Sequence, residues 1–260
     1  MARSSLKPSS LRSRPLLSSS PLFPARSPSS PLHHDSRSSE TLAYGVIQPS
    51  DQRFDATALV LHGLLGSGRN WRTFARNLAS ELSKRSPSDE WRMVLADLRN
   101  HGRSAGIRGL EPPHDMVNAA RDLANLVKSH DWNWPDVVIG HSMGGKVALE
   151  FAASCARGDY GESAILPKQL WVLDSVPGEV NSEDSDGEVE KVVVDHMLSL
   201  GFSKSTHEWI GSNLKKEGER VTWSFDLHAA IEMFQSYRYW SLLEHLPKGL
   251  EIAIVRRKQR

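Results

Sequence analysis

From about residue 42 onward, short runs of consecutive apolar residues alternate with segments in which apolar residues recur every three or four positions. Such runs are typical of strands buried on both faces, and the longer period is typical of one face of a helix. The runs predict strands at residues 58–62, 91–98, 136–140, 169–174 and 251–255. The periodic segments predict helices at residues 67–84, 116–127 and 144–156. This alternation indicates an α/β fold with a mostly parallel, doubly wound sheet.

After Pro177 the alternation stops. Residues 179–190 hold six acidic side chains, which is typical of a solvated loop. The pattern beyond them predicts helices near residues 189–199, 205–216 and 227–245. We therefore expect a core domain over residues 41–177, a helical cap inserted at residues 178–248, and a return to the core in residues 249–260.

The first forty residues differ from the rest of the chain. About one third of them are Ser, and residues 1–34 carry five basic side chains and no acidic one. A basic, Ser-rich and acid-poor start predicts an organellar transit peptide over residues 1–40, and a plain disordered tail is the alternative. The Ser and Pro content favours the chloroplast over the mitochondrion.

Composition excludes several classes of protein. The net charge of +1 comes from the leader, because residues 35–260 carry 27 basic and 31 acidic side chains. We therefore expect no nucleic-acid partner. The longest apolar runs have about four residues, whereas a membrane-spanning helix needs about 20, so we expect no transmembrane segment. The single cysteine, Cys155, excludes an internal disulfide framework and a Cys-rich metal site.

The most informative motif is Gly140-His-Ser-Met-Gly-Gly145, which matches the nucleophile-elbow pattern G-x-S-x-G. A predicted strand leads into it and a predicted helix leads out. A serine in a strained turn with positive φ needs neighbours without side chains, because the strand and the helix pass close together. Ser142 is therefore the candidate nucleophile. It would lie at a helix N-terminus, where the N–H of Met143 can stabilise an oxyanion.

A second turn, His62-Gly-Leu-Leu-Gly-Ser67, follows the predicted strand at 58–62. A turn there can direct a backbone N–H into the same crevice and complete an oxyanion hole. We assign that N–H to Leu64, with Leu65 as the alternative.

Two further segments are informative: Asp97-Leu-Arg-Asn-His-Gly-Arg-Ser104 and Val172-Leu-Asp-Ser-Val-Pro177. In these segments, in the elbow motif and in the turn at residues 62–67, the sequence resembles the alpha/beta-hydrolase superfamily. It is most similar to esterases of the group that includes abhydrolase-domain-containing protein eleven. The resemblance covers about residues 42–255. It implies a serine esterase or thioesterase that acts on small acyl esters or thioesters without a cofactor or metal. It also implies that Ser142 is the nucleophile and Asp174 the acid of the triad.

Other polar residues near these motifs have structural interpretations. Asp174 could merely end a strand, and Asp226 is an alternative acid. We expect His101 to be a structural loop residue that lines the site, and His141 to pack beneath the elbow. We expect Asp97 and Arg99 to fix their loop by an ion pair.

The resemblance also predicts a histidine base after the last core strand, because a serine hydroxyl needs such a base. In this sequence Val255 is followed only by Arg-Arg-Lys-Gln-Arg. We therefore expect the fold to be C-terminally incomplete. The remaining candidate bases lie in the predicted cap: His196, His207, His228 and His245.

Two other functions stay open. The first is a catalytically impaired hydrolase-fold protein that binds a partner or a lipid, which the missing histidine favours. The second is a nucleotide-binding protein, because Gly140 to Lys146 fits G-x-x-x-x-G-K. The full pattern has a Ser or Thr after the Lys, which coordinates Mg²⁺. This sequence has Val147 at that position, which argues against nucleotide binding.

Overall fold

The structure is a computed structural model that describes residues 41–48, 54–86, 90–175, 178–179, 213–217, 220–242 and 247–256. The predicted leader, the predicted helix at 189–199 and most of the acidic run lie outside the described residues. So do His196, His207 and His245. The domain boundaries expected from the sequence therefore stay predictions.

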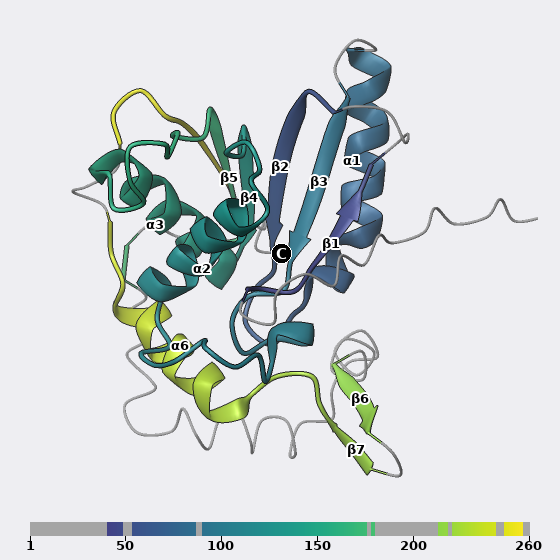
Figure 1. Cartoon of the computed structure of the whole chain (residues 1–260), viewed down its shortest axis with the longest axis vertical. Helices are drawn as coiled ribbons and strands as arrows, with labels where there is room; N and C mark the ends of the chain where they lie inside the picture. Colours follow the sequence, from purple (N-terminus) through teal and green to yellow (C-terminus); the bar gives the residue numbers. More distant parts are fainter. Residues whose placement is uncertain are drawn as a thin grey trace, which may run out of the picture. The chain divides into compact units, whose positions relative to one another are not determined.

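Six strands form one sheet in the order β1-β3-β2-β4-β5-β8 (Figure 1). β1 is antiparallel to β3, and the other four pairings are parallel. The strands are β1 (Tyr44–Ile47), β2 (Ala56–Leu61), β3 (Trp91–Ala96), β4 (Val137–His141), β5 (Gln169–Leu173) and β8 (Glu251–Val255). The predicted mostly parallel sheet is confirmed. β1 was not predicted, because it is a half-buried edge strand of four residues whose apolar pattern Gly45 interrupts.

Helices cover both faces of the sheet, as the continuous apolar strands require. On one face, Ala75 and Ala79 of α1 (Arg72–Arg85) pack against Met93 and Leu95 of β3. On the other face, α2 (Met116–Ser129) and α3 (Met143–Arg157) form the larger core cluster. Two short 3₁₀ helices, η1 (Gly68–Trp71) and η2 (Gly102–Ser104), follow β2 and β3.

One prediction in the cap region is wrong, and a second is confirmed only in part. Where a helix was expected to end at residue 216, the chain forms the strand β6 (Leu214–Glu217), which pairs with β7 (Arg220–Trp223). The sequence signal for this hairpin is Gly218 between the strands and the β-favouring Val-Thr-Trp that follows. The helix expected at 227–245 is α6 (Leu227–Tyr239), and it ends at Trp240, whose backbone is extended.

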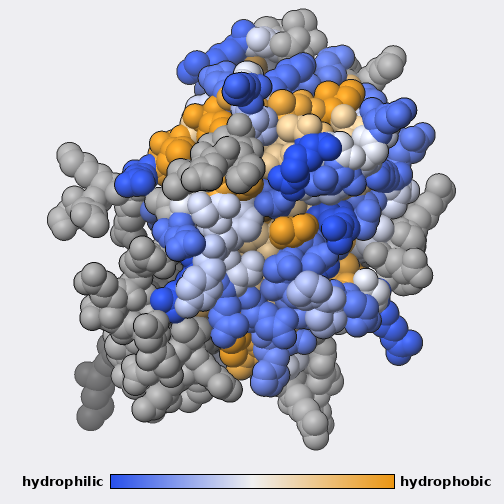
Figure 2. All heavy atoms as spheres, turned by 90° about the vertical axis from the view of Figure 1, so that its left-hand side faces the viewer, coloured by the Kyte–Doolittle hydropathy of each residue, from blue (hydrophilic) through white to orange (hydrophobic). Residues whose placement is uncertain are grey.

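The surface on the side where α3 lies in Figure 1 is mostly hydrophilic, with apolar patches between the polar groups (Figure 2). Large apolar side chains that are exposed in the described chain include Ile165, Trp171, Ile254 and Val255. No helix among the described residues is long and apolar enough to cross a membrane.

Candidate active site

Ser142 lies on the turn between β4 and α3, with φ 50° and ψ −119°. A non-glycine residue with this backbone conformation is strained, and the surrounding structure must hold it in place. The Ser142 N–H donates to the carbonyl of Leu173 on β5 at 2.8 Å, and its carbonyl accepts from the N–H of Gly145 at 2.9 Å. The strained turn predicted from G-x-S-x-G is therefore present, with Ser142 half-buried at its apex.

The glycines of the motif are needed for space. A Cβ on Gly140 would collide with the backbone of Gly144, and a Cβ on Gly145 would lie 3.0 Å from side-chain atoms of Val172 and Ser175. The strand, the turn and the first turn of the helix can approach each other this closely only without side chains, as the sequence predicted.

The turn after β2 lies against the elbow. It closes with a hydrogen bond from the Gly66 N–H to the Gly63 carbonyl at 3.0 Å, and Leu65 has φ 56°. The N–H groups of Leu64, Leu65 and Met143 make no hydrogen bond with any other described residue. They are therefore free to donate to a ligand atom. Their assignment to an oxyanion hole stays a prediction.

His62 and His101 are fully buried and hold the loops that follow β2 and β3. Nδ1 of His62 donates to the Gly63 carbonyl at 2.8 Å, and Nε2 accepts from the Leu98 N–H at 2.9 Å. Nδ1 of His101 donates to the Arg99 carbonyl at 2.8 Å. Burial lowers the pKa of both rings, that of His101 to about 3, so both are neutral at physiological pH. These contacts support a structural role for His101.

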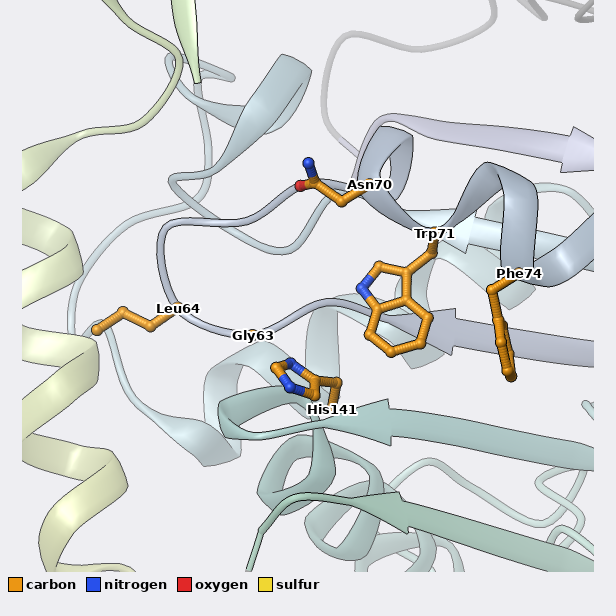
Figure 3. A pocket seen from close by; sticks show the side chains of 6 residues that line it. All are labelled: Gly63, Leu64, Asn70, Trp71, Phe74 and His141. Carbon is orange, nitrogen blue, oxygen red and sulfur yellow. The ribbon is translucent and has the colours of Figure 1, made fainter. Parts of the chain in front are cut away.

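His141 does not pack under the elbow but lies at the edge of a pocket beside it (Figure 3). The pocket has a volume of about 300 Å³ and is lined by Gly63, Leu64, Asn70, Trp71, Phe74 and His141. A Cβ on Gly63 would lie 2.9 Å from Nδ1 of His141 and 3.2 Å from Cβ of Ser142, so the pocket adjoins the candidate nucleophile. Burial lowers the pKa of His141, and the nearby Asp174 opposes this shift.

Trp71 and Phe74 lie in the segment predicted as a helix at residues 67–84, with the three-residue spacing of one helix face, and the sequence gave no signal for this pocket. The Trp71 ring lies 5.4 Å from that of His141, and Phe74 is 39% exposed. Trp71 packs partly against the core on the α1 face of the sheet, and both side chains line the pocket.

Asp174 follows β5 with φ 50°, and its side chain is exposed. Its N–H donates to the carbonyl of Val255 on β8 at 2.7 Å. Among the described residues, no imidazole is hydrogen-bonded to Ser142 or to Asp174. Asp226, the alternative acid, instead caps α6, since its carboxylate accepts from the Ala229 N–H at 3.1 Å. His228 lies exposed on α6.

Asp97 and Arg99 do form ion pairs that fix their loop, but not with each other. The Asp97 carboxylate accepts from the Gly68 N–H at 2.7 Å and pairs with Arg103 at 3.1 Å. The Arg99 guanidinium makes a buried bidentate pair with Asp122 on α2, at 2.7 and 3.0 Å. Asp97 therefore connects the loops after β2 and β3, and Arg99 attaches the second loop to α2.

The nucleotide-binding interpretation fails on Lys146. Its side chain is fully buried, and Nζ donates to three backbone carbonyls. It is therefore not available to a phosphate group. Within the described ranges, no group of three or more His, Cys, Asp or Glu side chains could hold a metal ion.

Three comparisons bear on this site. A family profile described as alpha/beta hydrolase fold matches residues 59–154, which include the elbow and the turn after β2. The sn-1-specific diacylglycerol lipase ABHD11 of Danio rerio is 26% identical over 72% of this chain and 58% of its own length. A probable alcohol acetyltransferase of Saccharomyces cerevisiae is 36% identical over 35% of this chain and 24% of its own length. The chain thus spans only part of the relatives it matches.

Among solved structures, a marine microorganism esterase superposes with a TM-score of 0.61 at 18% identity, covering 84% of this chain and 91% of the other. At that identity the likeness concerns the fold alone.

Proposed function

Because the chain belongs to the alpha/beta-hydrolase superfamily and resembles its ABHD11 group, we propose that it is a serine hydrolase. It would cleave carboxylic ester or thioester bonds through an acyl-Ser142 intermediate. The relatives support acyl chemistry, since one is a diacylglycerol lipase and another a probable alcohol acetyltransferase.

In the proposed reaction, Oγ of Ser142 attacks the acyl carbonyl carbon and passes its proton to a base. The negative charge that develops on the carbonyl oxygen is stabilised by the N–H groups of Met143 and Leu64. The alcohol or thiol leaves with a proton, and water then hydrolyses the acyl-serine. Asp174 would orient a histidine base, which the described residues do not place.

The observation that carries this proposal is the conformation of Ser142, held at φ 50° on a turn whose neighbouring N–H groups have no partner among the described residues. Backbone strain of this kind persists where the surrounding structure over-determines it, which is common at active sites. A structural serine would gain nothing from it.

The test is covalent labelling of the full chain with a fluorophosphonate probe, followed by turnover of p-nitrophenyl acetate. We expect labelling and turnover that Ser142→Ala abolishes. Ser175→Ala is the matched control, because Ser175 is a buried neighbour of the elbow and its Oγ has no hydrogen-bond partner among the described residues. Equal labelling of wild type and Ser142→Ala would reject the proposal.

A catalytically impaired binding protein is the second candidate. It is favoured by the absence of an imidazole bonded to Ser142 or Asp174 in the described part of the chain. In that case the probe would bind weakly or not at all, and no ester would turn over. Turnover that depends on Ser142 would exclude this candidate.

We also propose import into the chloroplast, on the composition of residues 1–40. Residues 1–40 fused to a fluorescent protein should direct it to plastids. A fusion in which the five basic residues of the leader are replaced by Gln should stay in the cytosol. Delivery to mitochondria would favour the alternative compartment.

A further inference from the structure

Lys146 is a buried cation that the proposed reaction does not use. It lies on α3, one turn after Ser142, and its side chain is 0% exposed. Nζ donates to the carbonyls of Gly178 at 2.8 Å, Tyr237 at 2.5 Å and Trp240 at 2.9 Å. An ammonium group has three donors, and all three are used here. Burial of such a charge is tolerated only when it is fully hydrogen-bonded.

The three carbonyls belong to the region that the sequence predicts to be a cap. Tyr237 is in the last turn of α6 and Trp240 is its C-cap, where carbonyls lack partners within the helix and favour a cation. The ammonium also lies 4.6 Å from the centroid of the Tyr237 ring. One turn further along α3, the Glu150 carboxylate accepts from the Trp240 indole N–H at 2.8 Å. Two charged residues on one face of α3 thus hold the end of α6.

The beginning of α6 is attached elsewhere. The Asp226 N–H donates to the carbonyl of Asn100 at 2.8 Å, and Phe225 pairs with His101 in an isolated bridge. Both contacts are to the loop that follows β3. α6 therefore runs from the carboxyl end of β3 to α3, and Ser142 lies at the carboxyl end of β4, which β2 separates from β3 in the sheet. In Figure 3, the Leu64 side chain, one of those that line the pocket, extends towards α6.

We propose that Lys146 is a positioning residue that clamps α6 and the start of the cap segment onto α3. Because Ser142 is the N-cap of α3, the clamp fixes α6 relative to the nucleophile and so fixes the opening through which an acyl chain reaches it. This second part rests on the proposed function. The three hydrogen bonds are made to backbone carbonyls, so they depend on the side chain at position 146 and not on the side chains of its partners.

The clamp is tested by hydrogen–deuterium exchange of the full chain, which requires no activity. In Lys146→Met, amides of residues 227–239 should exchange about ten- to a hundredfold faster, because three hydrogen bonds to the docked end are lost. The exchange rates of amides in α1, on the other face of the sheet, should not change.

Lys146→Gln supplies two donors, so its exchange rates over residues 227–239 should be intermediate. This variant carries the test if Lys146→Met does not fold. Lys128→Met, at an exposed site on α2, is the matched control. Exchange of residues 227–239 within about twofold of wild type in both variants would overturn the clamp.

The effect on the opening is tested with p-nitrophenyl acetate and p-nitrophenyl octanoate. Loosening of α6 should raise KM for octanoate at least about fivefold more than KM for acetate, because only the longer chain extends to the cap. An unchanged ratio of the two KM values, with faster exchange of α6, would overturn the role in the opening and leave the clamp. Absence of turnover in the wild type would instead reject the proposed function, and the exchange result would still decide the clamp.

Discussion

Gly144 faces the carbonyl oxygen of His62 so closely that a Cβ placed on Gly144 would lie 2.5 Å from that oxygen. This contact joins the first turn of α3 to the end of β2. It sets the separation between the N–H of Met143 and the turn that carries the N–H of Leu64. The two proposed oxyanion donors are therefore positioned by one backbone contact that only glycine permits.

Gly144→Ala should force these two segments apart. Because the colliding atom is backbone and cannot rotate away, we expect a loss of about 3 kcal/mol or more in the free energy of unfolding. Fluorophosphonate labelling of Ser142 should fall at least about a hundredfold, since one oxyanion donor alone is worth that much. Urea unfolding and labelling rates measure the two effects.

The control is Gly161→Ala, because Gly161 has φ 89° and no heavy atom within 4 Å of an added Cβ. This variant has backbone strain but no collision, so it should lose only about 1 kcal/mol and label normally. Equal losses in the two variants would mean that the approach of Gly144 to His62 has no special effect.

The elbow could be predicted from the sequence because its cause is local. Gly140, Ser142 and Gly144 are close in sequence, and the apolar run before them and the helical period after them set the direction of the chain. The core strands could be predicted for a similar reason, since strands buried on both faces require continuous apolar runs.

The partners of the buried charges could not be predicted, because they depend on distance in space. Arg99 meets Asp122 across 23 positions, and Lys146 meets the carbonyl of Trp240 across 94. No periodicity encodes such pairs. Lys146 instead matched a phosphate-binding pattern that fails at Val147, and its burial among carbonyls excludes that interpretation. The pocket was also hidden, since Trp71 and Phe74 have the period of a core helix face.

The buried ion pair between Arg99 and Asp122 gives a second prediction. Their side chains are only 4% and 9% exposed, so Arg99→Met leaves a buried carboxylate without its partner. We expect a loss of about 3–5 kcal/mol in the free energy of unfolding. Replacing both residues, as in Arg99→Met with Asp122→Leu, should recover part of this loss.

Arg103→Met is the comparison variant, because Arg103 also pairs with a buried aspartate but is itself 49% exposed. It should lose no more than about 1 kcal/mol. Chemical denaturation at pH 7 compares the two single variants. A loss for Arg99→Met as small as that for Arg103→Met would contradict the prediction.

His101 should make the protein sensitive to acid. Its folded-state pKa of about 3 lies below the ordinary value of 6.5, because burial disfavours the charged ring. Above pH 6.5 the ring is neutral in both states. As the pH falls below 6.5, only the unfolded chain takes up the proton, so stability is lost. At pH 4.5 this loss reaches about 2–3 kcal/mol.

Unfolding free energies of wild type and His101→Gln, measured between pH 7.5 and 4.5, should therefore converge. His228→Gln, at an exposed site on α6, should keep the slope of the wild type.

Because of Lys146, the free energy of unfolding should rise at alkaline pH. Burial lowers its pKa from 10.5 to about 8, with Glu179 opposing the shift. Between these two values the unfolded chain binds more protons than the folded one, so the free energy of unfolding increases with pH. The increase for a shift of this size is as much as about 3 kcal/mol. This increase is complete above pH 10.5, and it is lost as the pH falls through 8.

The difference in unfolding free energy between wild type and Lys146→Met should therefore grow from pH 7.5 to pH 10. The contributions of the other titrating groups cancel in this comparison. Lys128→Met should follow the wild type. A constant difference would mean that Lys146 keeps an ordinary pKa and that its three carbonyls fully compensate the burial of its charge.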